Sequence, residues 1–358
     1  MNTDRPDHRF SISHSIDLSC KISPTSKTEK AARLILTNRL RVIIQICLAM
    51  VLVSSLTVGC QPVATPTHFT LRLALLPILD ALPIYAAEQL GYFAAQGVKV
   101  SFVPVASAVE RDQVMAAGQA DGMINDLVAV TLYNRDQAQV QVVRFAQVAT
   151  KKQPEYRILV SPKSKLAVPA DLKGVDIGIS KASVIEYVTE RLLEAEGLAP
   201  ADIHTTVVPK IPDRLSLLSS ERLQAATLPE PFSTLAVKAG SRVLLDDSAH
   251  PEYGSSVISI RKTVIIDHQQ EVAGFLKALE QAVTDIDRDP TRWSGLMRQY
   301  NLIPLGLVDS YPAPTYPAFS LPSETQFNDV VDWAISKGMI SQRVNYQDSV
   351  IQAIGQGK

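Results

Sequence analysis

Six polar residues at the ends of strand-like runs are the residues best placed to do chemistry in this chain. They are Asp80, Asn125, Asp126, Ser180, Ser183 and Glu230. In an open α/β sheet, ligands bind outside the carboxyl ends of the strands, where loops lead into helix N-termini. Carboxylate, amide and hydroxyl groups at that edge can hydrogen-bond a small molecule without covalent chemistry. We therefore expect a polar ligand-binding site there.

The charge of these loops indicates what kind of ligand to expect. They contain Asp80, Asp126 and Glu230 but no arginine. Burying an anion beside carboxylates is costly without compensating cations, so a neutral or amine-bearing ligand is expected. The alternative for the three acids is a structural role at the start of helices.

Three tyrosines near the same loops offer aromatic faces to a flat ring. They are Tyr85, Tyr187 and Tyr253, with Tyr187 as the first candidate. The alternative for each tyrosine is packing in the core. Together with the acids, the tyrosines favour a heteroaromatic ligand over a sulfonate.

The sequence pattern does not predict a set of catalytic groups. Residues 178–182 loosely copy the nucleophile elbow of hydrolases around Ser180, but the second glycine is missing. A base would have to come from scattered histidines, none of which pair at metal-ligand spacing on one helix; they are His68, His204, His250 and His268. We expect a protein that is not an enzyme, with no metal and no cofactor.

The elements that must position these residues alternate between strand and helix patterns. Strands are predicted over residues 71–77, 98–105, 121–124, 157–161, 175–180, 204–209 and 242–247, with helical patterns between them, the first over 84–96. After residue 268 the pattern is mainly helical. This alternation predicts an α/β fold with mostly parallel sheets flanked by helices.

Length and charge limit the function classes. With 358 residues, the chain is long enough for two domains of ordinary size. It carries 35 Lys and Arg against 36 Asp and Glu, and no long basic run. Nucleic acid is therefore not an expected partner.

The N-terminal region has the pattern of an export signal. Residues 42–58 carry no charge and follow Arg39 and Arg41, which is typical of a signal peptide, although a transmembrane anchor is the alternative. Residues 56–60 resemble the lipobox of bacterial lipoproteins, with Thr57 where leucine is commonest. This resemblance implies a lipid on Cys60 and a location on the extracytoplasmic face of the cell membrane. Residues 1–59 are then a signal peptide with a polar extension, and 60–67 a tether.

Four segments, over residues 81–105, 116–122, 171–180 and 223–232, occur in an order that resembles one family. It is the solute-binding proteins of ABC importers, in the sulfonate, nitrate, taurine and thiamine-precursor group. The resemblance implies a type II periplasmic-binding-protein-like fold with two lobes, residues 68–155 plus 252–358 and residues 156–251. The ligand would be clamped between the lobes and delivered to an ABC permease with its ATPase.

The resemblance also indicates a ligand. Residues 103–112 lack the tryptophan and the glycine-rich turn typical of sulfonate and taurine members. Overall similarity to the vitamin-binding branch implies riboflavin, and next a thiamine-type pyrimidine. A sulfonate, taurine or nitrate-type anion is the alternative, as is a ligand-sensing lipoprotein that is not coupled to import.

Overall fold

The computed structural model describes residues 39–46, 69–308 and 310–352. The chain divides into two compact units, Met1–Thr67 and His68–Lys358. In the first unit a helix spans residues 39–46. No helix within the described ranges is long and apolar enough to cross a membrane. The predicted lipobox with Cys60, the tether and most of the predicted signal peptide lie outside the described residues.

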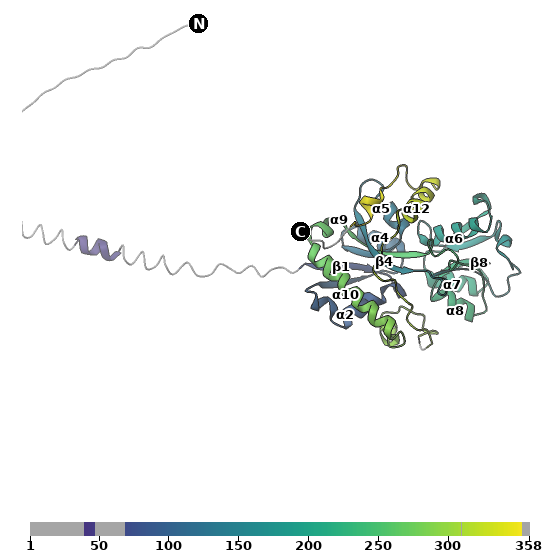
Figure 1. The fold of residues 1–358 in the computed structure, drawn as a ribbon, viewed down its shortest axis with the longest axis horizontal. Coiled ribbons are helices and arrows are strands. Elements are labelled where there is room, and N and C mark those ends of the chain that lie inside the picture. The colour runs from purple at the N-terminus through teal and green to yellow at the C-terminus, as the bar shows by residue number, and fades with distance from the viewer. Residues whose placement is uncertain (1–38, 47–68, 309, 353–358) are drawn as a thin grey trace, which may run out of the picture. The chain divides into compact units, whose positions relative to one another are not determined.

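The second unit contains two five-stranded sheets, and we call the first sheet with its helices lobe 1 (Figure 1). The strand order is β2-β1-β3-β10-β4. Strand β1 pairs in parallel with β2 and β3, whereas β10 runs antiparallel to β3 and β4. The strands are β1 (Thr70–Leu75), β2 (Lys99–Pro104), β3 (Gly122–Asn125), β4 (Val140–Val148) and β10 (Ser255–Arg261).

The second sheet, with its helices, forms lobe 2 and repeats this arrangement. Its order is β7-β6-β8-β5-β9. Strand β6 pairs in parallel with β7 and β8, and β5 runs antiparallel to β8 and β9. The strands are β5 (Tyr156–Val160), β6 (Asp176–Ile179), β7 (His204–Val207), β8 (Ala225–Pro229) and β9 (Arg242–Asp246).

Helices cover both faces of the lobe 1 sheet and bury two apolar cores against it. The longest helix, α10, buries Phe275, Leu279 and Ile286 on one stripe, because apolar residues three or four positions apart share a helix face. Each large apolar side chain buried in this way stabilises the fold by roughly 1.5–3 kcal/mol. The helices of lobe 1 are η1 (Leu79–Ala81), α2 (Leu82–Gln89), α3 (Tyr92–Ala95), α4 (Ala108–Ala116), α5 (Leu127–Tyr133), α9 (Lys262–Asp267), α10 (Gln269–Arg288), α11 (Ser294–Gln299), α12 (Glu324–Ser336) and α13 (Tyr346–Ser349).

Lobe 2 is a three-layer unit of the same kind. Helix α6 packs on one face of its sheet, and α7 and α8 pack on the other. In Figure 1 these helices gather around β8, apart from α2, α10 and β1 of lobe 1. The helices of lobe 2 are η2 (Pro169–Leu172), α6 (Val184–Ala195), η3 (Pro200–Asp202), α7 (Ile211–Ser219) and α8 (Phe232–Lys238).

The sequence predicts the α/β class, mostly parallel sheets and most of the strands. In each sheet four strands run in the same direction and one is reversed, β10 in lobe 1 and β5 in lobe 2, so the prediction of mostly parallel sheets is confirmed. Two details differ from the prediction. The predicted strands lack β4, β8 and β10. The helix predicted over 84–96 is broken into α2 and α3, because Gly91 adopts a left-handed conformation with φ of 73°, which glycine takes without steric cost.

The chain passes between the lobes twice, from β4 to β5 and from β9 to β10. Side-chain contacts also join the lobes away from these passages, and two of them serve as examples. The Arg191 guanidinium of α6 pairs with Asp329 of α12 at 3.0 Å. The Tyr311 hydroxyl donates to Glu230 Oε2 at 3.0 Å. The lobes are thus held against each other, while the residue boundaries proposed for them from the sequence stay a prediction.

Candidate functional site

A cleft lies at the carboxyl ends of strands from both sheets. It encloses about 720 Å³ of empty space, counted to its open mouth. Residues after β1, β2 and β3 line it from lobe 1, and residues after β6, β7 and β8 line it from lobe 2. Six of the seven ligand-binding residues proposed from the sequence line this cleft, namely Asp80, Asn125, Asp126, Ser180, Ser183 and Glu230.

Helix starts explain why three polar side chains stand at the cleft. Asp126 is the N-cap of α5, and its Oδ1 accepts the Ala129 N–H at 2.8 Å. Ser183 is the N-cap of α6, where its hydroxyl accepts the Ile185 N–H at 3.3 Å. Ser107 caps α4 in the same manner. Capping satisfies backbone donors that have no partner within the helix. The Ser183 hydroxyl also donates to the Ser180 carbonyl at 2.8 Å, whereas Asp126 keeps its second oxygen, Oδ2, on the side of Arg111.

The lobe 1 wall holds a carboxyl and an amide in fixed orientations. The Ser256 hydroxyl donates to Asp80 Oδ2 at 2.5 Å, and burial raises the pKa of Asp80. The Ser259 hydroxyl donates to Asn125 Oδ1 at 2.9 Å. This bond fixes the amide, whose buried Nδ2 has no hydrogen-bond partner among the described residues.

The lobe 2 wall is built around Ser180 and Glu230. The Ser180 hydroxyl donates to the Pro209 carbonyl at 2.9 Å and accepts from Arg214 Nη1 at 3.0 Å. Glu230 pairs with Arg157 at 2.6 Å. Both walls therefore combine hydrogen-bond donors with carboxylates.

The stacking role proposed for three tyrosines finds no place in the cleft. Tyr187, the first candidate, donates its hydroxyl to Asp329 at 2.5 Å and packs edge-on against Tyr253 and Trp333. Tyr85 stacks on Tyr300 with ring centroids 3.6 Å apart. Neither Tyr85, Tyr187 nor Tyr253 lines the cleft. Their aromatic faces are used by protein contacts, so the structure gives no support to a stacking role for these three residues.

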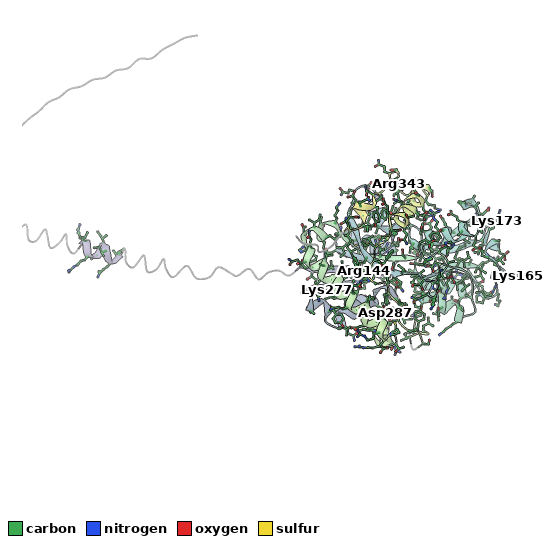
Figure 2. All side chains as sticks on the ribbon, in the orientation of Figure 1. Arg144, Lys165, Lys173, Lys277, Asp287 and Arg343 are labelled. Carbon is green, nitrogen blue, oxygen red and sulfur yellow. The ribbon has the colours of Figure 1, made fainter. Side chains whose placement is uncertain are left out.

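Arginines surround the cleft, contrary to the expectation of a loop set without cations. Arg111 lines it and lies 3.9 Å from Asp126 Oδ2. Arg157 and Arg214 stand behind the lobe 2 wall through Glu230 and Ser180. All three lie inside helices or strands, and their long side chains reach the loops from there. The exposed lysines Lys165 and Lys173, by contrast, lie at the far end of lobe 2 (Figure 2).

The lining residues that were not proposed from the sequence include Glu155 and Tyr156. These two residues lie where the chain enters lobe 2. Burial, together with Asp80 and Asp247, raises the pKa of Glu155 well above its ordinary value, so the protonated form is favoured. Burial and the nearby carboxylates also raise the pKa of Tyr156, so its phenol stays a donor. Their position at a strand start, rather than after a strand, explains why the search of strand ends missed them.

The chemistry that this arrangement supports is non-covalent binding. The Ser180 hydroxyl is engaged by Pro209 and Arg214, and none of the described histidines lines the cleft. Among the described residues, no group of three His, Cys, Asp or Glu side chains could hold a metal ion. The cleft instead contains hydrogen-bond acceptors and donors from both lobes.

Comparison with solved structures shows a shared fold. The alkanesulfonate-binding protein SsuA from Xanthomonas axonopodis pv. citri, bound to MOPS, is 19% identical with a TM-score of 0.67, covering 79% of this chain and 98% of its own. The ligand-binding component of an ABC-type import system from Staphylococcus aureus, with zinc bound, is 14% identical with a TM-score of 0.66, covering 78% and 96%. The enzyme DSZB in complex with biphenyl-2-sulfinic acid is 14% identical with a TM-score of 0.59, covering 78% and 96%. At these identities the likeness establishes the two-lobed periplasmic-binding-protein-like fold.

Sequence comparison adds the family. No curated protein sequence matches the chain at a significant level. The family model described as NMT1/THI5 like matches residues 79–292. This span starts at the first helix of lobe 1, includes all of lobe 2 and ends beyond α10. Because the match covers more than half of the 358 residues, the protein belongs to the NMT1/THI5-like family.

Proposed function

We propose that this protein is the solute-binding component of an ABC-type importer. The observation that carries the proposal is the cleft between two lobes, with Asn125 and Asp126 on one wall and Ser180 and Glu230 on the other. A ligand that contacts both walls stabilises the closed arrangement over an open one by its difference in affinity for the two. A permease can then recognise the closed form. The import-system component from Staphylococcus aureus, which has the same fold, supports this assignment.

The ligand that we propose first is an organic anion of the sulfonate type. Arg111, Arg157 and Arg214 place positive charge around the cleft, which removes the main argument for a neutral or amine-bearing ligand. The fold relative from Xanthomonas binds alkanesulfonates. Riboflavin and thiamine-type pyrimidines come second, because the tyrosines that favoured a flat ring pack elsewhere.

Hydrolysis receives no support from the site. The DSZB relative is an enzyme, but the Ser180 hydroxyl contacts Pro209 and Arg214 rather than a base. Among the histidines that the structure describes, His204, His250 and His268, none contributes to the cleft lining. We therefore keep a binding function without a chemical step.

Partners and location follow from the same proposal. We infer that the cysteine of the lipobox-like segment, Cys60, carries a lipid that holds the protein at the outer face of the cell membrane, and that the partners are an ABC permease and its ATPase. The support is the sequence pattern of residues 42–60. Import, rather than sensing, is the role that we propose.

A ligand screen tests the proposed function. After unfolding and refolding, to remove any ligand carried through purification, thermal unfolding is followed with alkanesulfonates, taurine, nitrate, riboflavin and aminopyrimidines. A ligand that binds only the folded state raises the midpoint in a saturable manner. We expect such a rise with at least one of these solutes, and a chain that responds to none of them would contradict the proposed function.

A matched pair of variants locates the binding. Ala106 lies exposed on the cleft lining just before the N-cap of α4, and Ala117 lies exposed at the C-cap of α4, outside the lining. Ala106→Trp should abolish the ligand-induced rise by filling the cleft, while Ala117→Trp should keep it. A rise that survives Ala106→Trp would place the ligand elsewhere.

A further inference from the structure

Buried donors without partners gather at the cleft. Four buried nitrogens donate to no hydrogen-bond partner among the described residues, namely Arg111 Nη2, Asn125 Nδ2, Arg214 Nε and Arg214 Nη2. Buried polar groups in folded proteins are nearly always paired, so each exception needs a reason. Arg111 and Asn125 line the cleft directly, and Arg214 reaches it through Ser180. Both walls of the cleft therefore contain hydrogen-bond donors that lack an acceptor.

Arg214 stands apart in its charge environment. Within the described residues three arginines are fully or almost fully buried, Arg111, Arg144 and Arg214. Arg111 is close to Asp112 and Asp126, and Arg144 pairs with Glu280, whereas no carboxylate in the described part of the chain pairs with Arg214. Its side chain is 0% exposed. An unpaired buried cation destabilises the folded protein, and a negative charge on a ligand would offset that cost.

The local structure holds this guanidinium against the cleft wall. Arg214 Nη1 donates to Ser180 Oγ and to the Val208 carbonyl, both at 3.0 Å. A Cβ at Gly178 would lie 2.7 Å from the Leu223 side chain and 3.4 Å from Arg214 Cγ, so glycine at this position leaves room for both. Burial lowers the pKa of Arg214 to about 9, and the side chain is therefore still charged at neutral pH.

The Ser180 hydroxyl can link Arg214 to a ligand by accepting a hydrogen bond from the guanidinium and donating one to the ligand. A hydroxyl has one proton and two lone pairs, so it can keep accepting from Arg214 while turning its proton from the Pro209 carbonyl to a group in the cleft. A hydroxyl that accepts from a cation is a stronger donor, because hydrogen bonds in a chain polarise one another. Asn125 offers its Nδ2 from the opposite lobe.

Pairing the arginines with their carboxylates leaves one cation for a ligand. Arg111 is compensated by Asp112 and Asp126, and Arg157 by Glu230. Arg214 is the cation of this group that no carboxylate among the described residues compensates. Asp80 and Glu155 are the other carboxyls of the lining, and burial raises the pKa of each, which favours the protonated form. Resting on the proposed solute-binding function, we infer that Arg214, acting with Ser180 and facing Asn125 across the cleft, selects a ligand with a singly charged, three-acceptor oxyanion head group of the sulfonate class.

The test compares a charged ligand with its neutral isostere. Isothermal titration measures binding of 1-propanesulfonate and 1-propanesulfonamide to the protein and to three variants, Arg214→Met, Ser180→Ala and Arg222→Met. Arg222 is an exposed arginine of lobe 2 that does not line the cleft, so its variant controls for the same change in net charge. Since hydrogen bonds to charged groups contribute about 1.5–3 kcal/mol, Arg214→Met should weaken sulfonate binding on the order of 30-fold.

The expected pattern is specific to a role in selecting the anion. The protein prefers the sulfonate, Arg214→Met loses that preference, Ser180→Ala weakens it, and Arg222→Met keeps it. Without ligand, Arg214→Met should unfold at the same or a higher temperature, because replacing an unpaired buried charge with an apolar side chain is often stabilising. A purely structural arginine would instead lower the midpoint and affect both ligands equally.

Two results would overturn the inference. One is a protein that binds the sulfonamide as tightly as the sulfonate, or binds neither. The other is a sulfonate preference that survives both Arg214→Met and Ser180→Ala. If another solute of the screen still raises the unfolding midpoint and Ala106→Trp blocks that rise, the proposed binding function stands and only the anion selection by Arg214 fails.

Discussion

A single buried carboxyl should make the stability of this protein depend on pH. Asp247 lies just after β9, where the chain leaves lobe 2, and is 0% exposed. Its Oδ1 accepts the backbone N–H groups of Glu155 at 2.9 Å and Tyr156 at 3.2 Å. It thus ties together the two passages between the lobes. Its Oδ2 is buried without a hydrogen-bond partner in the part of the chain that the structure describes.

The direction and size of the effect follow from the pKa of this carboxyl. Burial raises the pKa of Asp247 from 3.8 to about 7, and the N–H groups of Tyr156 and Glu155 only partly oppose the rise. Between pH 4 and 7 the folded state therefore holds a proton that the unfolded state releases. Its contribution to the free energy of unfolding is largest at low pH and falls as the pH rises. The full loss, reached above pH 7, is on the order of 4 kcal/mol.

The substitution Asp247→Asn isolates this carboxyl. Asparagine keeps the Oδ1 acceptor for both N–H groups and cannot ionise. The free energy of unfolding in urea, measured from pH 4.5 to 8, should fall for the natural protein relative to the variant by up to about 4 kcal/mol. If the new amide itself destabilises the protein, that change in the free energy of unfolding does not depend on pH. It therefore does not affect how the difference between the two proteins varies with pH. Asp246→Asn, a neighbouring change of the same charge, is the control.

A constant difference between the two proteins across this range would refute the reasoning. It would mean that Asp247 ionises at its ordinary pKa, and hence that water reaches Oδ2 despite its burial. A difference with the opposite slope would mean that the N–H groups of Glu155 and Tyr156 outweigh desolvation. The pH dependence therefore measures which of the two environments dominates.

Two further predictions concern the same passage and the membrane. Gly254→Ala should destabilise the protein by about 1–3 kcal/mol or more, because the alanine Cβ would lie 1.7 Å from Asp247 Oδ2. Gly295→Ala is the control and should be tolerated, because no atom lies within 4 Å of its Cβ. Urea unfolding measures the difference between the two variants. Cys60→Ser should release the protein from membranes on cell fractionation, and continued retention would favour a transmembrane anchor instead of a lipid.

Much of the cleft could be predicted from the sequence because ligands of α/β sheets bind at the carboxyl ends of the strands. Asp126 and Ser183 cap helices that begin directly after parallel strands, so one short polar residue marks a strand end, a helix start and a position at the edge of the sheet. Local chemistry fixes all three properties together. Strands β4 and β10, which pair antiparallel with each other, carry no such mark, because β4 leads into one passage between the lobes and β10 follows the other.

Tyr187 illustrates where a local pattern has two competing interpretations. Its spacing with Val184 and Val188 predicts the buried face of a helix, and its position near the Ser180–Ser183 loop suggests contact with a ligand. In the structure the buried face is the correct interpretation, with Tyr187 against Trp333 of α12. The sequence does not say which helix, 140 or so positions away, will cover this face, so the choice depends on tertiary packing.

A survey of loop residues predicts the charge of the cleft incorrectly, and the error has a physical cause. Short acids such as Asp80 must stand in the loop itself to reach a ligand, whereas arginine can reach the same space from within a helix or strand. Arg111 and Arg214 do so from α4 and α7. A loop survey therefore counts the carboxylates and misses their counter-charges. Once the arginines are paired with their carboxylates, one buried cation remains, and this remaining charge, rather than the number of acids, determines which ligand the cleft favours.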